Sequence, residues 1–194
     1  PQDTQPAAVK KILRTDDYER WRRITDPAIS DDGAWATYAY SKPNAFNPEV
    51  VLHIESLLDD TEFELLDASE ARFSDDSRWV AYFVDLTFDE AQKLRRKEAP
   101  RPRTVQLLNL ASGERLTWAN AAAFQFSAGA EFLAVKKARA DRDADHEGSD
   151  LVLRDLERGT EQLIGSVNEF AFDQQLTGDT EHLPPDRDAR WLAY

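Results

Sequence analysis

The chain of 194 residues contains no cysteine and no methionine. Without cysteine, neither a disulfide framework nor a thiolate metal site can form. Without methionine, Pro1 cannot be a translational start, so we expect further residues before it. The polar opening from Pro1 to Pro6 is typical of a mature exported protein after signal cleavage, which predicts a periplasmic or secreted location. An arbitrary chain boundary at Pro1 is the alternative, and the sequence leaves both open.

Long apolar runs and positive net charge are missing as well. No apolar run approaches the length that crosses a bilayer, so we predict no transmembrane segment. The 24 basic and 37 acidic side chains give a net charge of −13. DNA, or an anionic membrane surface, would be repelled on average, and we expect no nucleic-acid partner. The hydrophobic content of 41% is enough for a packed core.

Catalytic motifs are also absent from the sequence. Nucleophilic hydrolysis on an α/β-hydrolase fold needs Gly-x-Ser-x-Gly at a strand-to-helix turn, and no such pentapeptide occurs. Gly165 and Ser166 lack the second glycine, so we interpret Ser166 as a turn residue. We predict no catalytic residue in this chain.

Metal-ligand spacing is not found among the three histidines, His53, His146 and His182. His53 lies in a strand-like run and is predicted to be a surface or core histidine. An EF-hand loop starting at Asp141 would need Gly and Glu where the chain has His146 and Val152. A looser cation site would use Asp141, Asp143 and Asp145, and a solvated connector is the alternative that we favour. We therefore predict no metal and no cofactor.

Residues 71–84 form the unit that the rest of the chain repeats. Phe73 ends one strand, a Ser-Asp-Asp-Ser turn follows, and Trp79 begins a second strand, which predicts a β-hairpin. The strand at 79–84 is apolar on both faces, so it must be covered on both sides. The Ser-Asp-Asp turns could also be paired catalytic carboxylates, but their recurrence favours turn formation.

The same phrase begins again at Ile29 and Phe126 and, interrupted, at Phe172, and its turns are 44, 53 and 46 residues apart. Each repeat supplies four strand-like runs, which in the second repeat are 71–73, 79–84, 104–110 and 114–118. This period predicts an all-β fold of β-propeller blades with four antiparallel strands, about three and a half of them. The expected divisions are a lead and helix at 1–24, blades at 25–70, 71–122 and 123–168, and a partial blade at 169–194.

Two helices interrupt this pattern. Thr15 is the expected N-cap of a short helix that packs Leu13, Tyr18 and Trp21 against the first repeat. A helical insertion at 85–103 interrupts the second blade. It carries a basic run on an acidic chain, namely Lys93, Arg95, Arg96, Lys97, Arg101 and Arg103. The run predicts docking of a partner or an acidic substrate, and a merely solvated helix is the alternative.

The fourth repeat is incomplete. Sixteen residues separate Asp173 from Arg190, where the second repeat has three. Either a loop is inserted in this hairpin, or the sequence joins pieces that are not contiguous. A propeller cut within a blade exposes a strand edge, so we expect the chain to be part of a longer protein.

These repeats resemble the N-terminal propeller of the prolyl oligopeptidase family of serine peptidases, especially its exported bacterial members. The resemblance covers nearly all of residues 15–172. It rests on the opening at 17–27, the phrases at Ile29, Phe73 and Phe126, the basic insertion, and the strand and turn at 150–161.

The resemblance implies a role that is not catalytic. In that family the propeller caps a C-terminal α/β-hydrolase domain and restricts access to short peptides, while Ser, Asp and His of the hydrolase domain do the chemistry. None of those motifs has a counterpart here, so the implied partners are a hydrolase domain and a peptide substrate. A periplasmic propeller that acts as a scaffold or binding subunit of a larger complex is the alternative.

Overall fold

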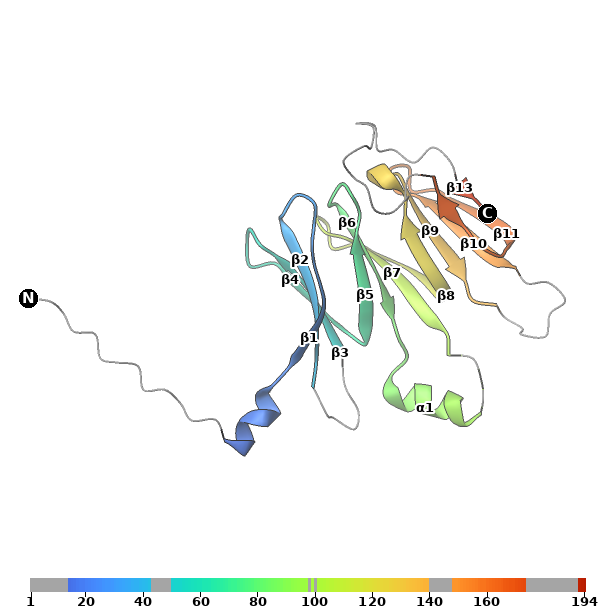
Figure 1. The fold of residues 1–194 in the computed structure, drawn as a ribbon. Coiled ribbons are helices and arrows are strands. Elements are labelled where there is room, and N and C mark those ends of the chain that lie inside the picture. The colour runs from blue at the N-terminus through green and yellow to red at the C-terminus, as the bar shows by residue number, and fades with distance from the viewer. Residues whose placement is uncertain (1–13, 43–49, 98, 100, 140–147, 174–191) are drawn as a thin grey trace, which may run out of the picture.

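The computed structural model describes residues 14–42, 50–97, 99, 101–139, 148–173 and 192–194, and most of them lie in antiparallel strands (Figure 1). The first sheet has four strands in chain order. They are β1 (Arg23–Ile29), β2 (Trp35–Ser41), β3 (Val50–Ser56) and β4 (Glu62–Leu66). Each strand pairs with the next one along the chain.

The second sheet has seven strands, again each beside its neighbour in sequence. They are β5 (Ala68–Phe73), β6 (Trp79–Val84), β7 (Arg103–Asn109), β8 (Arg115–Phe126), β9 (Phe132–Lys137), β10 (Ser149–Asp155) and β11 (Glu161–Val167). A third sheet pairs β12 (Ala171–Phe172) with β13 (Leu192–Ala193). The predicted all-β character is confirmed, and these consecutive antiparallel strands fit a propeller.

Strand β8 differs from its prediction, which ended one strand at residue 118 and began another later. Its first part pairs with β7 and its second part with β9, so one continuous strand belongs to both neighbours. Asn120, with φ of 56°, lies where the two pairings meet. Asn and Asp adopt this left-handed conformation more readily than most residues, which lets the strand change direction.

Asp67 and Ser166 have the same left-handed conformation as Asn120, with φ of 54° and 60°. Asp67 follows β4 directly, and Ser166 lies inside β11 beside a shift in its register with β10. Ser166 is therefore a strand residue at a bulge rather than the turn residue expected from the sequence. Asp67 thus lies where the chain passes from the first sheet to the second, whereas Asn120 and Ser166 lie at irregular points of the strand pairing within the second sheet.

Strand β6 is covered on both faces, as its apolar pattern predicts. Every residue from 79 to 83 is at most 9% exposed. Trp79 and Phe83 pack in one cluster with residues of β7, β8 and β9. Val80 and Tyr82 pack in another cluster with Leu52 and other residues of the first sheet. This strand is thus the centre of the described core.

The Ser-Asp-Asp segments form turns, as expected. The Ser74 hydroxyl donates to Asp76 Oδ1 at 2.6 Å, and the Trp79 amide donates to Ser74 Oγ at 3.0 Å. In the first sheet the Ser30 hydroxyl donates to Asp32 Oδ1 at 2.6 Å in the same way. These side chains form hydrogen bonds within their own turns, so turn formation explains why the Ser-Asp-Asp segment recurs.

The N-terminal helix is a 3-10 helix, η1 (Thr15–Arg20), and two expectations about it are wrong. The residue before its first turn is Arg14 rather than Thr15, and the Arg14 amide donates to Asp17 Oδ2 at 2.9 Å. Tyr18 and Trp21 contact each other, with ring centroids 4.5 Å apart, and stay 61% and 45% exposed instead of packing on the first repeat. Leu13 lies outside the described residues.

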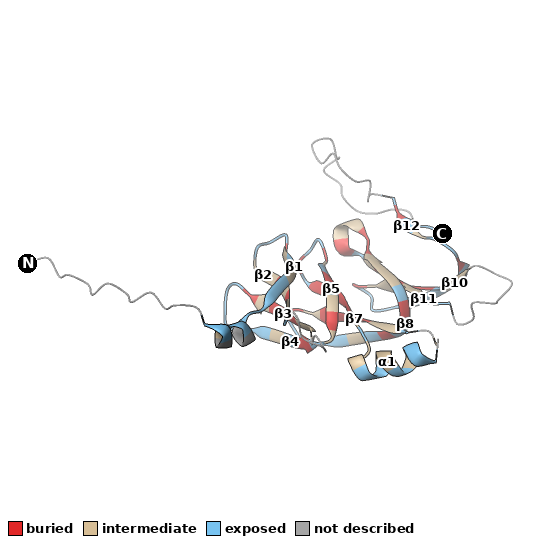
Figure 2. Cartoon of the chain, turned by 60° about the horizontal axis from the view of Figure 1, so that its bottom comes forward, coloured by how far each residue is buried: buried red, intermediate tan, exposed pale blue. Residues whose placement is uncertain are grey.

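Helix α1 (Phe88–Arg96) follows β6 and precedes β7 in the chain, and it lies beyond the ends of these strands (Figure 1). Thr87 caps it, since its hydroxyl accepts from the Glu90 amide while the Glu90 carboxylate accepts from the Thr87 amide. No residue of α1 is buried, and Figure 2 shows the helix in the colours of exposed and intermediate residues. In the part of the chain that the structure describes, no helix has the length and apolar character needed to span a membrane.

The short pair β12 and β13 continues the pattern of the earlier hairpins. Phe172 pairs with Leu192 as Phe73 pairs with Val80. Residues 174–191 lie outside the described residues, so the choice between an inserted loop and a join of separate pieces stays open. The looser cation site at Asp141, Asp143 and Asp145, together with His146 and His182, also lies outside them.

Candidate functional site

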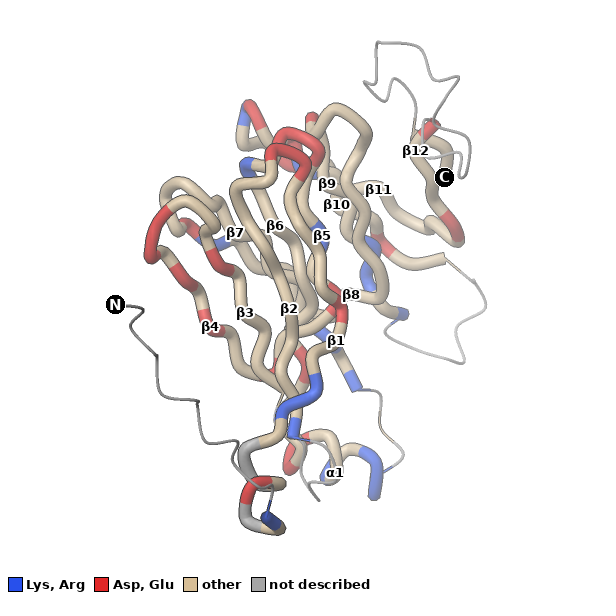
Figure 3. Tube along the Cα trace, turned by 60° about the vertical axis from the view of Figure 1, so that its left-hand side comes forward, with Lys and Arg blue, Asp and Glu red and all other residues tan. Residues whose placement is uncertain are grey.

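The predicted basic run lies on α1 and the segment after it (Figure 3). The helix N-terminus is acidic and its last turn is basic, which favours the helix through its dipole. Five of the predicted docking residues are exposed: Lys93, Arg95, Arg96, Lys97 and Arg101. Their role in docking remains a prediction.

Arg103 is placed differently from the rest of the basic run. Its Nε donates to Asp85 Oδ1 at 2.7 Å, and its Nη2 donates to Glu70 Oε1 at 2.9 Å. Its guanidinium lies 3.7 Å from the centre of the Phe83 ring. Arg103 thus ties β7 to β5 and to the end of β6, and two neighbouring carboxylates balance its charge.

A groove of about 420 Å³ opens between β5 and the second half of β8. Its walls combine aromatic rings with polar and charged side chains. They are formed by Arg72, Phe73, Asp75, Phe124, Gln125, Phe126 and Ala128. Asp75 is already engaged, since its Oδ2 accepts from the Gly129 amide at 3.0 Å. The groove therefore combines apolar surface with one basic and one acidic side chain.

The β1–β4 sheet has one face against the second sheet and one face away from it. Leu52 and Ile54 point to the covered face, where they join the cluster that includes Val80 and Tyr82. Because side chains alternate along a strand, His53 points to the other face. The cross-strand partners of His53 are Tyr38 on β2 and Glu64 on β4. Figure 3 shows the acidic positions that follow one another along β4.

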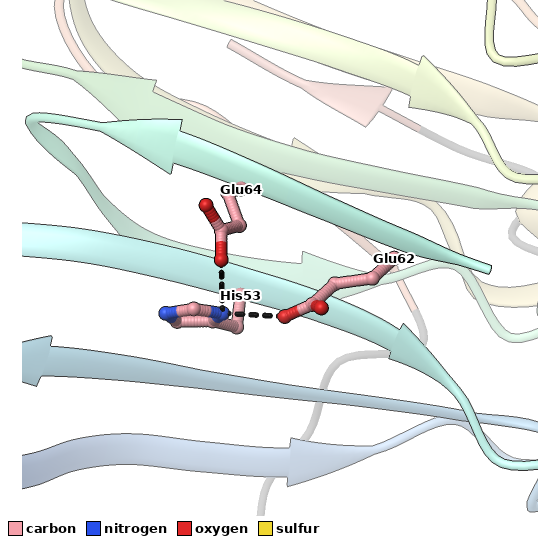
Figure 4. A group of neighbouring side chains, drawn as sticks. All are labelled: His53, Glu62 and Glu64. Carbon is pink, nitrogen blue, oxygen red and sulfur yellow. Dashed lines mark hydrogen bonds and ion pairs between the residues drawn. The ribbon is translucent and has the colours of Figure 1, made fainter. Parts of the chain in front are cut away.

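His53 meets two carboxylates on this outer face (Figure 4). Its Nδ1 lies 2.6 Å from Glu62 Oε1 and 3.9 Å from Glu64 Oε1. The side chain of His53 is 10% exposed, whereas those of Glu62 and Glu64 are 41% and 68% exposed. A buried imidazole therefore faces two carboxylates that reach solvent.

Two tyrosine rings hold the imidazole of His53. The Tyr38 ring stacks on it at a centroid distance of 5.1 Å and an angle of 12°, and the Tyr40 ring meets it edge-on at 4.8 Å. The Tyr38 hydroxyl donates to Glu55 Oε2 at 3.0 Å. Burial raises the pKa of Tyr38, and the hydrogen bond to the Glu55 carboxylate raises that pKa further.

A surface cavity of about 300 Å³ adjoins the imidazole. Its walls are Arg22, Tyr40, Ser41, Lys42, Val51, His53 and Glu64. The cavity gives solvent and small solutes access to the outer face beside the imidazole.

The sequence predicts His53 as a surface or core histidine and misses its two partners. A search for histidines at short spacing could not find them, because Glu62 and Glu64 come from the next strand. The available signal was the alternation of Glu62 and Glu64 together with the turn at 57–61, which sets the β3–β4 register. The structure places Ser166 in β11. It places the exposed residues of the predicted basic run on α1 and the segment after it.

Comparison with protein-family models finds no match, and comparison with curated proteins finds none. Solved structures do match this chain, which spans less than half the length of those described here. The β-propeller domain of the Trilobed protease from Pyrococcus furiosus has a TM-score of 0.52 and 14% identity, covering 78% of this chain and 45% of that chain.

Two peptidase structures match with lower TM-scores. Pyrococcus horikoshii acylaminoacyl peptidase has a TM-score of 0.48 and 16% identity, covering 80% of this chain and 27% of that chain. Prolyl oligopeptidase B from Galerina marginata has a TM-score of 0.43 and 12% identity, covering 80% of this chain and 26% of that chain. At the level of the fold, the predicted resemblance to propeller domains of prolyl-oligopeptidase-family peptidases is confirmed.

Proposed function

We propose that this chain is the N-terminal propeller portion of an exported, prolyl-oligopeptidase-like serine peptidase. Its role would be to gate the access of peptides to a C-terminal hydrolase domain. The observation that carries the proposal is the likeness of the fold to the propeller domain of the Trilobed protease. The sequence phrases at Ile29, Phe73 and Phe126 support it. Because a fold alone does not establish an activity, the catalytic domain must be sought directly.

In this proposal the sheets divide into blades at the left-handed residues. The β1–β4 sheet is the first blade, and the seven-stranded sheet is two blades that share β8. The pair β12 and β13 begins a fourth blade, and α1 is an insertion in the second. The groove between β5 and β8 would then lie between the first strands of adjacent blades, where an admitted peptide could contact Arg72 and the phenylalanine rings.

The test is the intact mass of the protein from its native source, with sequencing of the chain beyond Tyr194. A continuation of hydrolase size that carries Gly-x-Ser-x-Gly would support the proposal. An end close to Tyr194, or a continuation only as further blades, would contradict it.

A scaffold or binding subunit of a periplasmic complex is the second candidate, favoured by the exposed cations of α1. In that case the double change Arg95→Glu and Arg96→Glu should abolish co-purification of partner subunits from the native source. Arg158→Glu, in the exposed β10–β11 turn, is a matched control that reverses a charge elsewhere. If the complex survives the double change unaltered, docking through α1 is ruled out.

A further inference from the structure

We propose that His53, Glu62 and Glu64 form a binding site for a first-row divalent cation of the zinc type. The ligands would be the imidazole Nδ1 and one oxygen from each carboxylate, with water completing the coordination (Figure 4). The inference does not depend on the proposed peptidase role.

The positions of the three ligand atoms carry the first step. They all lie within 4.8 Å of one another. Zinc binds imidazole nitrogen and carboxylate oxygen at about 2.0–2.2 Å, so ligand atoms about 3–4 Å apart can share one ion. Glu64 Oε1 is already 3.9 Å from Nδ1, and the exposed side chain of Glu62 can turn outward from its 2.6 Å contact. Side-chain rotations suffice, and the strands need not move.

The fixed orientation of the imidazole is the second step. His53 is buried between the rings of Tyr38 and Tyr40, which leave its Nδ1 directed at the carboxylates. A ligand held in this way loses little conformational freedom when an ion binds. The apolar core lies on the opposite face of the sheet, and His53 is not part of it.

The charges on this face supply the third step, although Arg22 and Lys42 also line the cavity that adjoins His53 and Glu64. Within the described ranges, the ion pairs of both Glu62 and Glu64 are formed with His53. Glu55, the next carboxylate on the same face, is engaged by the Tyr38 hydroxyl. Two carboxylates and one imidazole are the mixed oxygen and nitrogen donors that suit zinc and its neighbours better than calcium.

The imidazole Nδ1 can either share a proton with Glu62 or bind a cation, but it cannot do both at once. In the structure Nδ1 contacts Glu62 at hydrogen-bond distance, which requires a proton between them. A bound cation would occupy the Nδ1 lone pair, and the neutral ring would carry its proton on Nε2 instead. The cation therefore replaces the hydrogen bond to Glu62 rather than adding to it.

The experiment is calorimetric titration of the metal-stripped full chain with zinc chloride, together with thermal unfolding in the presence and absence of zinc. We expect one ion per chain and a rise in the midpoint of thermal unfolding. Glu62→Gln and Glu64→Gln keep the size of each side chain, and both positions are exposed, so we expect both variants to fold. Each change should weaken zinc binding at least about tenfold. Loss of His53 in His53→Gln should weaken it at least as much.

Glu55→Gln is the matched control, because it removes one negative charge from the same face without removing a proposed ligand. Its zinc affinity should stay within about threefold of the unaltered chain, since only a screened long-range charge is lost. Equal weakening by Glu55→Gln would show that diffuse charge attracts the ion and would overturn the site. Binding that is undetectable, or that survives Glu62→Gln and Glu64→Gln together, would also overturn it.

Discussion

Successive residues of β3 face different surroundings across the β1–β4 sheet. Leu52 and Ile54 are 1% and 0% exposed and pack against the second sheet. His53, between them, points to the outer face, where it meets two tyrosine rings and two carboxylates. One face packs in the apolar core, and the other carries the imidazole and carboxylates that we propose as cation ligands. The alternation of side chains along a strand lets one short segment do both.

The largest effect should come from the packed face. Ile54→Ala removes a fully buried side chain and leaves a cavity between the sheets, so the free energy of unfolding should fall by about 2–5 kcal/mol. Urea unfolding followed by tryptophan fluorescence measures this change. Glu64→Gln on the outer face should change it by no more than about 0.5 kcal/mol. Similar losses for both variants would mean that the outer face is also packed.

Within the basic run, Arg103 is held by contacts with other residues, whereas Arg96 is exposed. Arg103→Ala removes two ion pairs and the contact with Phe83, so the free energy of unfolding should fall by about 1–2 kcal/mol. Arg96→Ala, on exposed α1, is the control and should change it by less than about 0.5 kcal/mol. Urea unfolding at low and high salt measures both. An Arg103→Ala chain as stable as the Arg96→Ala chain would argue against a structural role for Arg103.

A smaller effect should follow from a polar contact on the outer face. Tyr38→Phe keeps the ring that stacks on His53 but removes the hydrogen bond to Glu55, which should cost about 0.5–1.5 kcal/mol. The midpoint of urea unfolding reports the loss. If Tyr38→Phe and Glu55→Gln together cost as much as the two changes added, the two groups do not interact.

The smallest effect should lie in the turn between β1 and β2 and should depend on pH. Hydrogen bonds from the Ser30 hydroxyl and the Ala34 amide lower the pKa of Asp32 below its ordinary value of 3.8. Ionised Asp32 therefore adds stability above that value, and the contribution is lost as the pH falls through the lowered pKa. The stability gap between the unaltered chain and Asp32→Asn should be wider at about pH 7 than at about pH 2.

Unfolding midpoints of both proteins at the two pH values measure this gap. A gap that stays constant between the two pH values would show that the charge of Asp32 plays no part. Asp59, whose pKa is also lowered, is present in both proteins and cancels in the comparison.

Several elements could be predicted because their causes are local. The turns around Ser30 and Ser74 close through hydrogen bonds between residues two to five positions apart, so the sequence contains the whole interaction. The burial of β6 on both faces followed from its unbroken apolar character. By contrast, the expected packing of Tyr18 and Trp21 on the first repeat is wrong, because packing between distant segments depends on contacts that no local pattern contains.

Other features needed contacts that no local pattern contains. The continuous β8 follows from a left-handed residue at Asn120, which the sequence marks only as one polar residue among others. Arg103 belongs to the basic run by sequence, yet Glu70 lies 33 positions away and reaches it only because β5, β6 and β7 pair in order. The sequence pattern located Arg103 in the basic run but could not show that it contacts Glu70 and Asp85.

The sequence by itself determined the repeating hairpins, the alternation of the strands and the absence of a serine-hydrolase motif, because each of these is written in neighbouring residues. The tertiary structure decided which face of each strand is covered and which side chains of different strands meet. His53, Glu62 and Glu64 come together because the β3–β4 register sets Glu64 opposite His53 and Glu62 on the same face. The turn at 57–61 sets that register, and the packing of Leu65 in the core cluster stabilises it, since a shift of β4 by one residue would turn Leu65 outward.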